Sequence, residues 1–169
     1  QVSQVQTKFQ SLVDFTDATL VGLSAGGLVS GTGTDSMRSA DALTTTPAVA
    51  SGQNNIALGN GAQAEDLSSI AIGNVSVTNG NYGIAIGDDA VSGYFNDAIA
   101  IGRQSVSVRI DSIAIGKLAS VSSGSAGVAI GTDTSVVASN AVALGAQVTA
   151  LIADTVSIKA LEVQTDSTP

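Results

Sequence analysis

Ile70-Ala71-Ile72-Gly73 is the stretch that decides the fold, because close copies of this tetrad recur along most of the chain. The copies occupy residues 56–59, 70–73, 84–87, 99–102, 113–116, 128–131 and 142–145, and residues 156–159 hold an eighth, degenerate copy. The steps between successive fourth positions are 14, 14, 15, 14, 15, 14 and 14 residues. A repeat of this regularity predicts one short structural unit stacked on itself.

The rest of each unit is patterned as well. Small or β-branched residues recur three and five places after each tetrad glycine, as in Ala62/Ala64 and Ser105/Ser107. Since alternate residues of a strand share a face, each unit predicts two short strands joined at two corners. The glycine suits one corner. Asn and Asp residues such as Asp111 and Asn140 supply turn chemistry at the other.

A 14-residue unit is too short for a strand–helix–strand repeat. The predicted fold is therefore all-β: a solenoid of about eight 14-residue coils, stacked about 4.8 Å apart. The two 15-residue steps indicate one-residue insertions at a corner, around residues 94–95 and 123–125.

The first three residues of each tetrad are apolar, so both faces of the strand avoid water. We expect one face to fill the coil and the other to meet a second copy of the chain, which predicts an obligate homo-oligomer. The repeat core is assigned to the first, third and fourth tetrad positions. These residues are Ile56, Leu58, Gly59, Ile70, Ile72, Gly73, Ile84, Ile86, Gly87, Ile99, Ile101, Gly102, Ile113, Ile115, Gly116, Val128, Ile130, Gly131, Val142, Leu144 and Gly145.

Composition argues against most chemistry. The 169 residues include no Cys and no His, which removes thiol nucleophiles, the commonest general base and most transition-metal ligands. We therefore predict neither an enzyme nor a cofactor or metal site. A net charge of −8 disfavours nucleic acid as a partner, and no apolar run is long enough to span a membrane.

Four weaker signals have plain structural interpretations. Asp88-Asp89 is adjacent to a repeat glycine and is interpreted as a solvated turn in preference to a calcium site. The glycine-rich residues 31–35 lack the strand–helix context of a phosphate loop. Arg103, Arg109 and Lys117 are expected to be a solvated face, with a small basic stripe for an anionic glycan as the alternative. Finally, three aromatic residues are interpreted as local packing or as an exposed contact patch: Tyr82, Tyr94 and Phe95.

Residues 1–50 carry no repeat and form a separate predicted segment, ahead of the repeat domain (51–159) and a tail (160–169). Their conformation is expected to be mixed or extended. This segment is either a cap for the solenoid or an anchor that docks on a partner particle. The candidate attachment residues are Phe9, Leu12, Val13 and Phe15, of which Phe9, Leu12 and Val13 fall at helix-like spacing.

Tetrads of this type at 14-residue steps, with small residues three and five places on, resemble the YadA-like heads of trimeric autotransporter adhesins. The resemblance covers roughly residues 53–159. It implies a left-handed parallel β-roll, three chains side by side, and offers no catalytic residue to carry over. The family normally continues into a neck, a coiled-coil stalk and a membrane anchor, and these patterns do not follow the last tetrad here.

Residues 33–40 resemble bacteriophage structural proteins. Together with the missing neck and stalk patterns, this favours a trimeric fibre or capsid-decoration protein on the virion surface. Its expected partners are capsid or other virion proteins, and its expected roles are capsid stability or adsorption to the host. The alternative hypothesis is the head of a bacterial surface adhesin that binds host matrix or cells.

Overall fold

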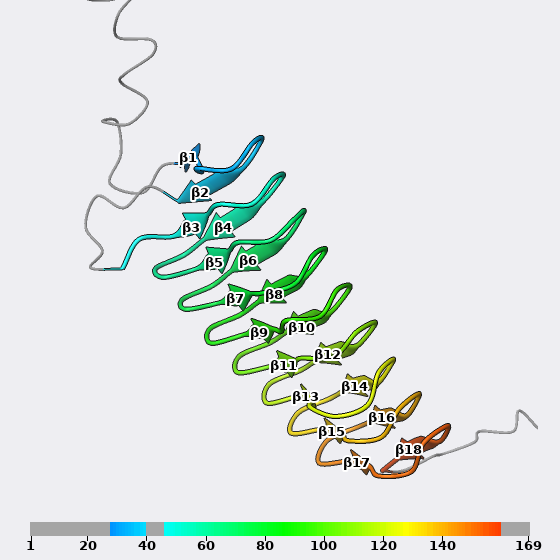
Figure 1. Ribbon diagram of the computed structural model, residues 1–169. Coiled ribbons are helices and arrows are strands. Elements are labelled where there is room, and N and C mark those ends of the chain that lie inside the picture. Colours follow the sequence, from blue (N-terminus) through cyan, green and yellow to red (C-terminus); the bar gives the residue numbers. More distant parts are fainter. Residues whose placement is uncertain (1–27, 40–45, 160–169) are drawn as a thin grey trace, which may run out of the picture.

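The protein is a β-solenoid in which each coil contributes one strand to each of two sheets (Figure 1). The computed structural model describes residues 28–39 and 46–159, and all regular structure in these ranges is β. The prediction of an all-β solenoid of about eight 14-residue coils is confirmed.

The longer strands form a ten-stranded sheet, in the order β1-β2-β4-β6-β8-β10-β12-β14-β16-β18. Their bounds are β1 Leu28–Ser30, β2 Met37–Ser39, β4 Ile56–Leu58, β6 Ile70–Ile72, β8 Ile84–Ile86, β10 Ile99–Ile101, β12 Ile113–Ile115, β14 Val128–Ile130, β16 Val142–Leu144 and β18 Val156–Ile158. All neighbours are parallel except β1 and β2, which are antiparallel. Equivalent tetrad positions pair with each other, as Ile99 does with Ile84 and Ile113.

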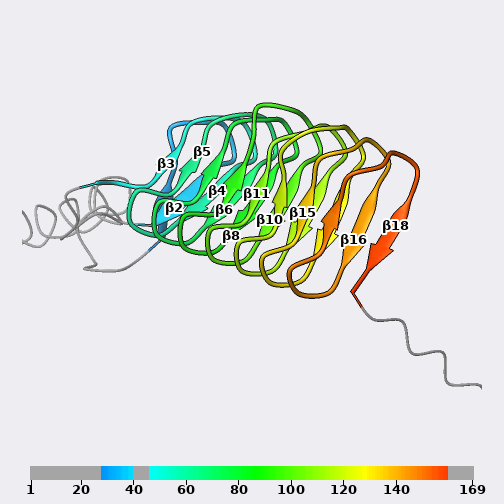
Figure 2. The same cartoon turned by 90° about the horizontal axis from the view of Figure 1, so that it is seen from below.

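The two-residue strands form a parallel eight-stranded sheet, in the order β17-β15-β13-β11-β9-β7-β5-β3. Their bounds are β3 Val49–Ala50, β5 Gln63–Ala64, β7 Val77–Thr78, β9 Val91–Ser92, β11 Val106–Ser107, β13 Ser120–Val121, β15 Ser135–Val136 and β17 Thr149–Ala150. Each coil is a flattened loop whose two strands lie on opposite sides (Figure 2). The core is therefore a thin layer between the sheets.

Small side chains fill this layer. The middle alanine of each tetrad points inward and is fully buried, as are the small residues of the opposite sheet. Inward hydroxyls bond to nearby carbonyl oxygens: Ser92 Oγ donates to Ala98 O (2.8 Å) and Ser105 Oγ donates to Gly102 O (2.9 Å). Every buried side-chain nitrogen or oxygen atom in the described residues has a hydrogen-bond partner. The interior is thus narrow, and its polar side-chain atoms are all hydrogen-bonded.

The assignment of the large tetrad residues to the coil interior is wrong. The first and third residues of each tetrad point out of the coil, as the half-buried, buried, half-buried pattern of Ile99–Ile101 shows. The physical reason is the narrow gap between the sheets, which admits Ala, Ser, Thr or Val but not two stacked Ile side chains. Residues Ile56, Leu58, Ile70, Ile72 and their equivalents therefore form an outer face.

The backbone conformation at the tetrad glycines, and the close approach of the next coil, require a residue without a Cβ. Gly87 has φ +137°, and a Cβ there would lie 2.5 Å from Gly102 O on the next coil. At the opposite corner a non-glycine residue of each coil adopts the left-handed conformation, including Asp97, Asp111 and Asn140 (φ 52–59°). Asn and Asp tolerate this region best, which explains their recurrence in the sequence.

Both predicted one-residue insertions lie between a short strand and the next tetrad. Ile99 follows Ser92 by seven positions, as Val128 follows Val121, whereas Ile84 follows Thr78 by six. The register is unchanged on either side, since Ile99 still pairs with Ile84. The corner therefore absorbs the extra residue.

The roll begins earlier than residue 51. β2 pairs with β4 in parallel and β3 pairs with β5, so residues 37–39 and 46–50 belong to a first, atypical coil. The antiparallel β1 covers the free edge of β2. A Cβ at Gly33 would meet Gly52 O at 1.8 Å, so this coil packs on the next through bare backbone. Residues 28–39 and 46–50 thus lie at the N-terminal end of the roll.

Candidate functional site

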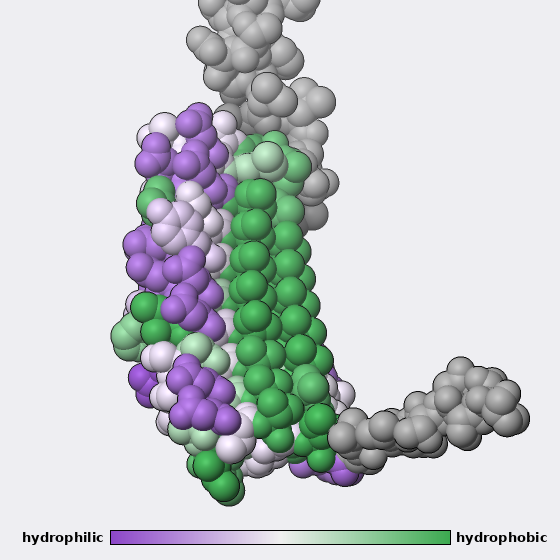
Figure 3. Space-filling model, turned by 90° about the vertical axis from the view of Figure 1, so that its right-hand side faces the viewer, coloured by the Kyte–Doolittle hydropathy of each residue, from purple (hydrophilic) through white to green (hydrophobic). Residues whose placement is uncertain are grey.

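The largest feature of the surface is an apolar face on the ten-stranded sheet. We call it the aliphatic face: the outward residues at the first and third tetrad positions, from Ile56 to Ile158. Figure 3 shows them as two columns that run the length of the roll. Ile115, Ile130 and Ile158 are 37%, 40% and 41% exposed in the single chain, although each side chain stacks on its neighbours. Contiguous apolar surface of this extent marks an interaction site.

The eight-stranded sheet presents a different outer surface. One residue of each strand points outward, and these residues change along the roll from mainly Val to hydroxyl side chains. They are Val49, Gln63, Val77, Val91, Val106, Ser120, Ser135 and Thr149. One column of smaller, partly polar side chains is an ordinary solvent-facing surface.

The corner that follows each tetrad glycine, here the post-glycine corner, is polar. Asn60 Nδ2 donates to Asn74 Oδ1 (3.1 Å), and Asn74 Nδ2 donates to Asp88 Oδ1 (2.8 Å). Asp88 and Asp89 are both exposed there, and no group of three His, Cys, Asp or Glu able to hold a metal ion occurs among the described residues. These contacts support the interpretation of Asp88-Asp89 as a turn.

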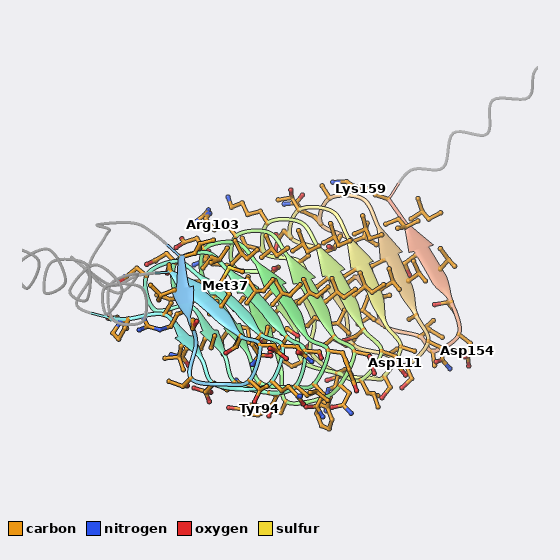
Figure 4. The ribbon with its side chains drawn as sticks, turned by 90° about the horizontal axis from the view of Figure 1, so that it is seen from above. Met37, Tyr94, Arg103, Asp111, Asp154 and Lys159 are labelled. Atoms are coloured by element: carbon orange, nitrogen blue, oxygen red, sulfur yellow. The ribbon has the colours of Figure 1, made fainter. Side chains whose placement is uncertain are left out.

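The three basic residues do not form the stripe that was the alternative to a solvated face. Arg103 and Lys117 occupy the post-glycine corner of neighbouring coils, but Arg109 follows β11 and lies at the other corner. Figure 4 shows Arg103 on one side of the roll and Asp111 on the opposite side. The sequence separation of six residues between Arg103 and Arg109 is close to half a coil, which is why it places them on opposite sides.

The segment that leads from each short strand to the next tetrad, here the return corner, carries the aromatic residues. Tyr82, Tyr94 and Phe95 are 49%, 79% and 46% exposed, so the rings are not packed inside the roll. The guanidinium carbon of Arg109 lies 5.8 Å from the centre of the Phe95 ring, within cation–π range. The signal for this pair in the sequence is its spacing of 14 residues, which equals one coil.

The glycine-rich residues 31–35 have no free amide cradle. Gly31 N donates to Ser36 O, and both Thr32 N and Gly33 N donate to Ala50 O. The amides of residues 31–33 are thus already bonded within the roll, which disfavours a phosphate loop. The attachment candidates Phe9, Leu12, Val13 and Phe15 lie outside the described residues. Within the described ranges, no helix is long and apolar enough to cross a membrane.

This architecture defines a parallel β-solenoid with an apolar outer face, and the comparisons identify its type. The family model described as the YadA head domain repeat matches residues 50–76, 67–90 and 96–119. The crystal structure of the collagen-binding domain of the Yersinia adhesin YadA is similar, with 25% sequence identity and a TM-score of 0.53. That similarity covers 72% of this chain and 75% of the other. No curated protein sequence matches significantly. The roll is therefore similar to a YadA head domain over these residues.

Proposed function

We propose that the protein is a homotrimeric, non-enzymatic adhesive head in which the aliphatic faces of three chains pack around a common axis. The observation that carries the proposal is the aliphatic face itself: two columns of large apolar residues with no covering element in the described part of the chain. A face of this kind is typical of an obligate interface.

The shape of the face supports packing between identical copies. It is straight and regular along the roll because every coil repeats the same two outward residues. Such a surface complements another copy of itself, and closed cyclic symmetry covers all copies at once. The choice of three chains comes from the similarity to YadA-like heads.

The ligand of this head is proposed to be host matrix, met at the bacterial cell surface. Support comes from the similar structure, which is the collagen-binding domain of an adhesin. In the proposed trimer the eight-stranded sheet and its corners face solvent, so receptor contacts fall there. No cofactor takes part.

Two measurements on the 169-residue chain test the proposal. Sedimentation equilibrium at low micromolar concentration is expected to give three times the chain mass of 16.6 kDa, with no folded monomer. Immobilised collagen and fibronectin are then offered to the trimer in a solid-phase binding assay. A folded monomer would overturn the packing proposal, and a trimer that binds neither matrix nor host cells would overturn the adhesive one.

A virion fibre or capsid-decoration protein is the second candidate. Its specific support is the resemblance of residues 33–40 to phage structural proteins, yet residues 33–39 already serve the first coil. The anchor in that case is residues 1–27, which contain Phe9 and Phe15. A chain truncated before Leu28 should keep its trimeric β-structure but fail to decorate particles. Equal decoration by both chains would remove this candidate.

A further inference from the structure

The aromatic residues of the described chain gather at one place. Tyr82, Tyr94 and Phe95 all lie at the return corner, and Tyr82 belongs to the coil next to the other two. Their place in the roll is marked in Figure 4 by Tyr94, on the side away from Arg103. We call Tyr82, Tyr94, Phe95, Arg109 and the nearby carboxylates of Asp97 and Asp111 the aromatic corner.

The inserted residue exposes this corner. Residues 94–97 are four consecutive exposed residues in the first 15-residue coil, and Tyr94 is the most exposed large hydrophobic residue described, at 79%. The backbone beneath is tightly packed, since a Cβ at Gly80 would lie 2.3 Å from Phe95 O. The backbone that carries Tyr94 and Phe95 therefore packs closely on the preceding coil.

The Arg109 side chain is held in the corner by two contacts. Its Nε donates to Ser122 O (2.9 Å), and its guanidinium group lies over the Phe95 ring. The flanking Asp97 and Asp111 side chains are exposed and make no ion pair in the described residues. The corner thus offers aromatic faces beside hydrogen-bonding carboxylates, with a local negative balance that repels sulfated or sialylated partners.

We propose that the aromatic corner binds glycans built from neutral sugars. Aromatic faces stack on the apolar C–H face of a pyranose ring, while carboxylate and guanidinium groups bond to its hydroxyls. The corner extends over three coils, about 10 Å along the roll. This length suits a short oligosaccharide, whereas a stable protein interface needs about 800 Å² from each partner.

This inference rests on the proposed adhesive function and names one ligand class for it. In a trimer the corner occurs three times, so weak single contacts add up through avidity. Matrix glycoproteins carry many copies of their glycans, which makes such multivalent contact effective.

The test is a glycan array that carries neutral chito-, manno- and N-acetyllactosamine oligosaccharides beside sialylated glycans and heparin. The wild-type trimer is compared with Tyr94→Ala/Phe95→Ala and with Leu118→Ala. Leu118 is a matched control because it is 41% exposed and lies at the post-glycine corner. We expect binding to at least one neutral class, and a loss of at least about tenfold in the double variant only.

Four results would overturn the inference: no binding to neutral glycans, binding to the anionic glycans alone, equal binding by the double variant, or loss of the trimer in that variant. The last would make the corner a subunit contact. Binding of the wild-type trimer to enzymatically deglycosylated collagen is measured separately. If that binding persists while the array is blank, the adhesive function stands and the glycan assignment falls.

Discussion

The coil interior and the aliphatic face lie on opposite sides of the same strands. Contrary to a usual hydrophobic core, the smaller side chains face the interior and the larger ones face outward. Ala100 is fully buried inside the coil, whereas its neighbours Ile99 and Ile101 point outward. The smallest residues form the core of the chain, and the largest remain for its surface. In a solenoid this thin, the large aliphatic side chains of the tetrads cannot pack inside the coil, and the proposed trimer is what would cover them.

A charge placed inside the coil should have the largest effect. Ala100→Asp would bury a carboxylate among alanines and hydroxyls with no room for water, at a cost of more than about 4 kcal/mol per chain. We expect no cooperative thermal transition by circular dichroism at any protein concentration. Ala100→Ser is the control, since serine occupies the same tetrad position at residue 157. A normal transition for the aspartate variant would contradict the inward assignment.

The same charge one residue later should act on assembly. Ile101→Asp places three carboxylates at the proposed trimer axis and should cost about 3 kcal/mol per chain. Because this penalty falls on association, raising the protein concentration should partly restore the melting temperature. Sedimentation equilibrium reads out the loss of trimer.

Val106→Asp is the matched control for Ile101→Asp. Val106 is a half-buried, outward residue on the eight-stranded sheet of the same coil. It should leave the trimer intact. If both variants dissociated alike, the two outer faces would not differ as proposed.

Substitutions at two tetrad glycines can distinguish the cost of backbone strain from the cost of close packing between coils. Gly87→Ala would put a Cβ 2.5 Å from Gly102 O at φ +137°, with an expected loss of about 1–3 kcal/mol in the free energy of unfolding. Gly145→Ala, at φ +108°, meets its nearest atom at 3.4 Å and should lose less. Chemical denaturation of both variants measures the difference, and equal losses would mean that packing contributes nothing.

A turn substitution should have the smallest effect. Asp111 is exposed and has φ 55°, a conformation that alanine adopts less readily than aspartate. Asp111→Ala should therefore lower stability by only about 0.5 kcal/mol, and Asp111→Asn by less. A larger loss of melting temperature in either variant would assign this corner a structural role beyond its turn.

The repeat made most of the fold predictable from sequence. Tetrad spacing gave the strands, their register and both insertion sites, because each depends on position alone. The direction of the side chains was not accessible in the same way. Ala and Ile are both apolar, so the pattern of Ile99–Ile101 does not say which of them faces inward.

Two further features of the structure were not predicted from the sequence, for different reasons. The first coil has Met37-Arg38-Ser39 in place of a tetrad, so no repeat signal marks it. The aromatic corner was named residue by residue, but Arg109 was grouped with Arg103 instead of Phe95. Their shared charge suggested grouping Arg109 with Arg103. The spacing of one coil is what brings Arg109 next to Phe95 instead.

The pairing of each coil with the next also bears on how the chain folds. Neighbouring strands of one sheet are equivalent residues of adjacent coils, so their contacts join residues only 14 or 15 apart in sequence. Contact order therefore stays low however many coils are added, and each finished coil offers an edge on which the next can form. A longer head gains reach without a slower search for its native pairing.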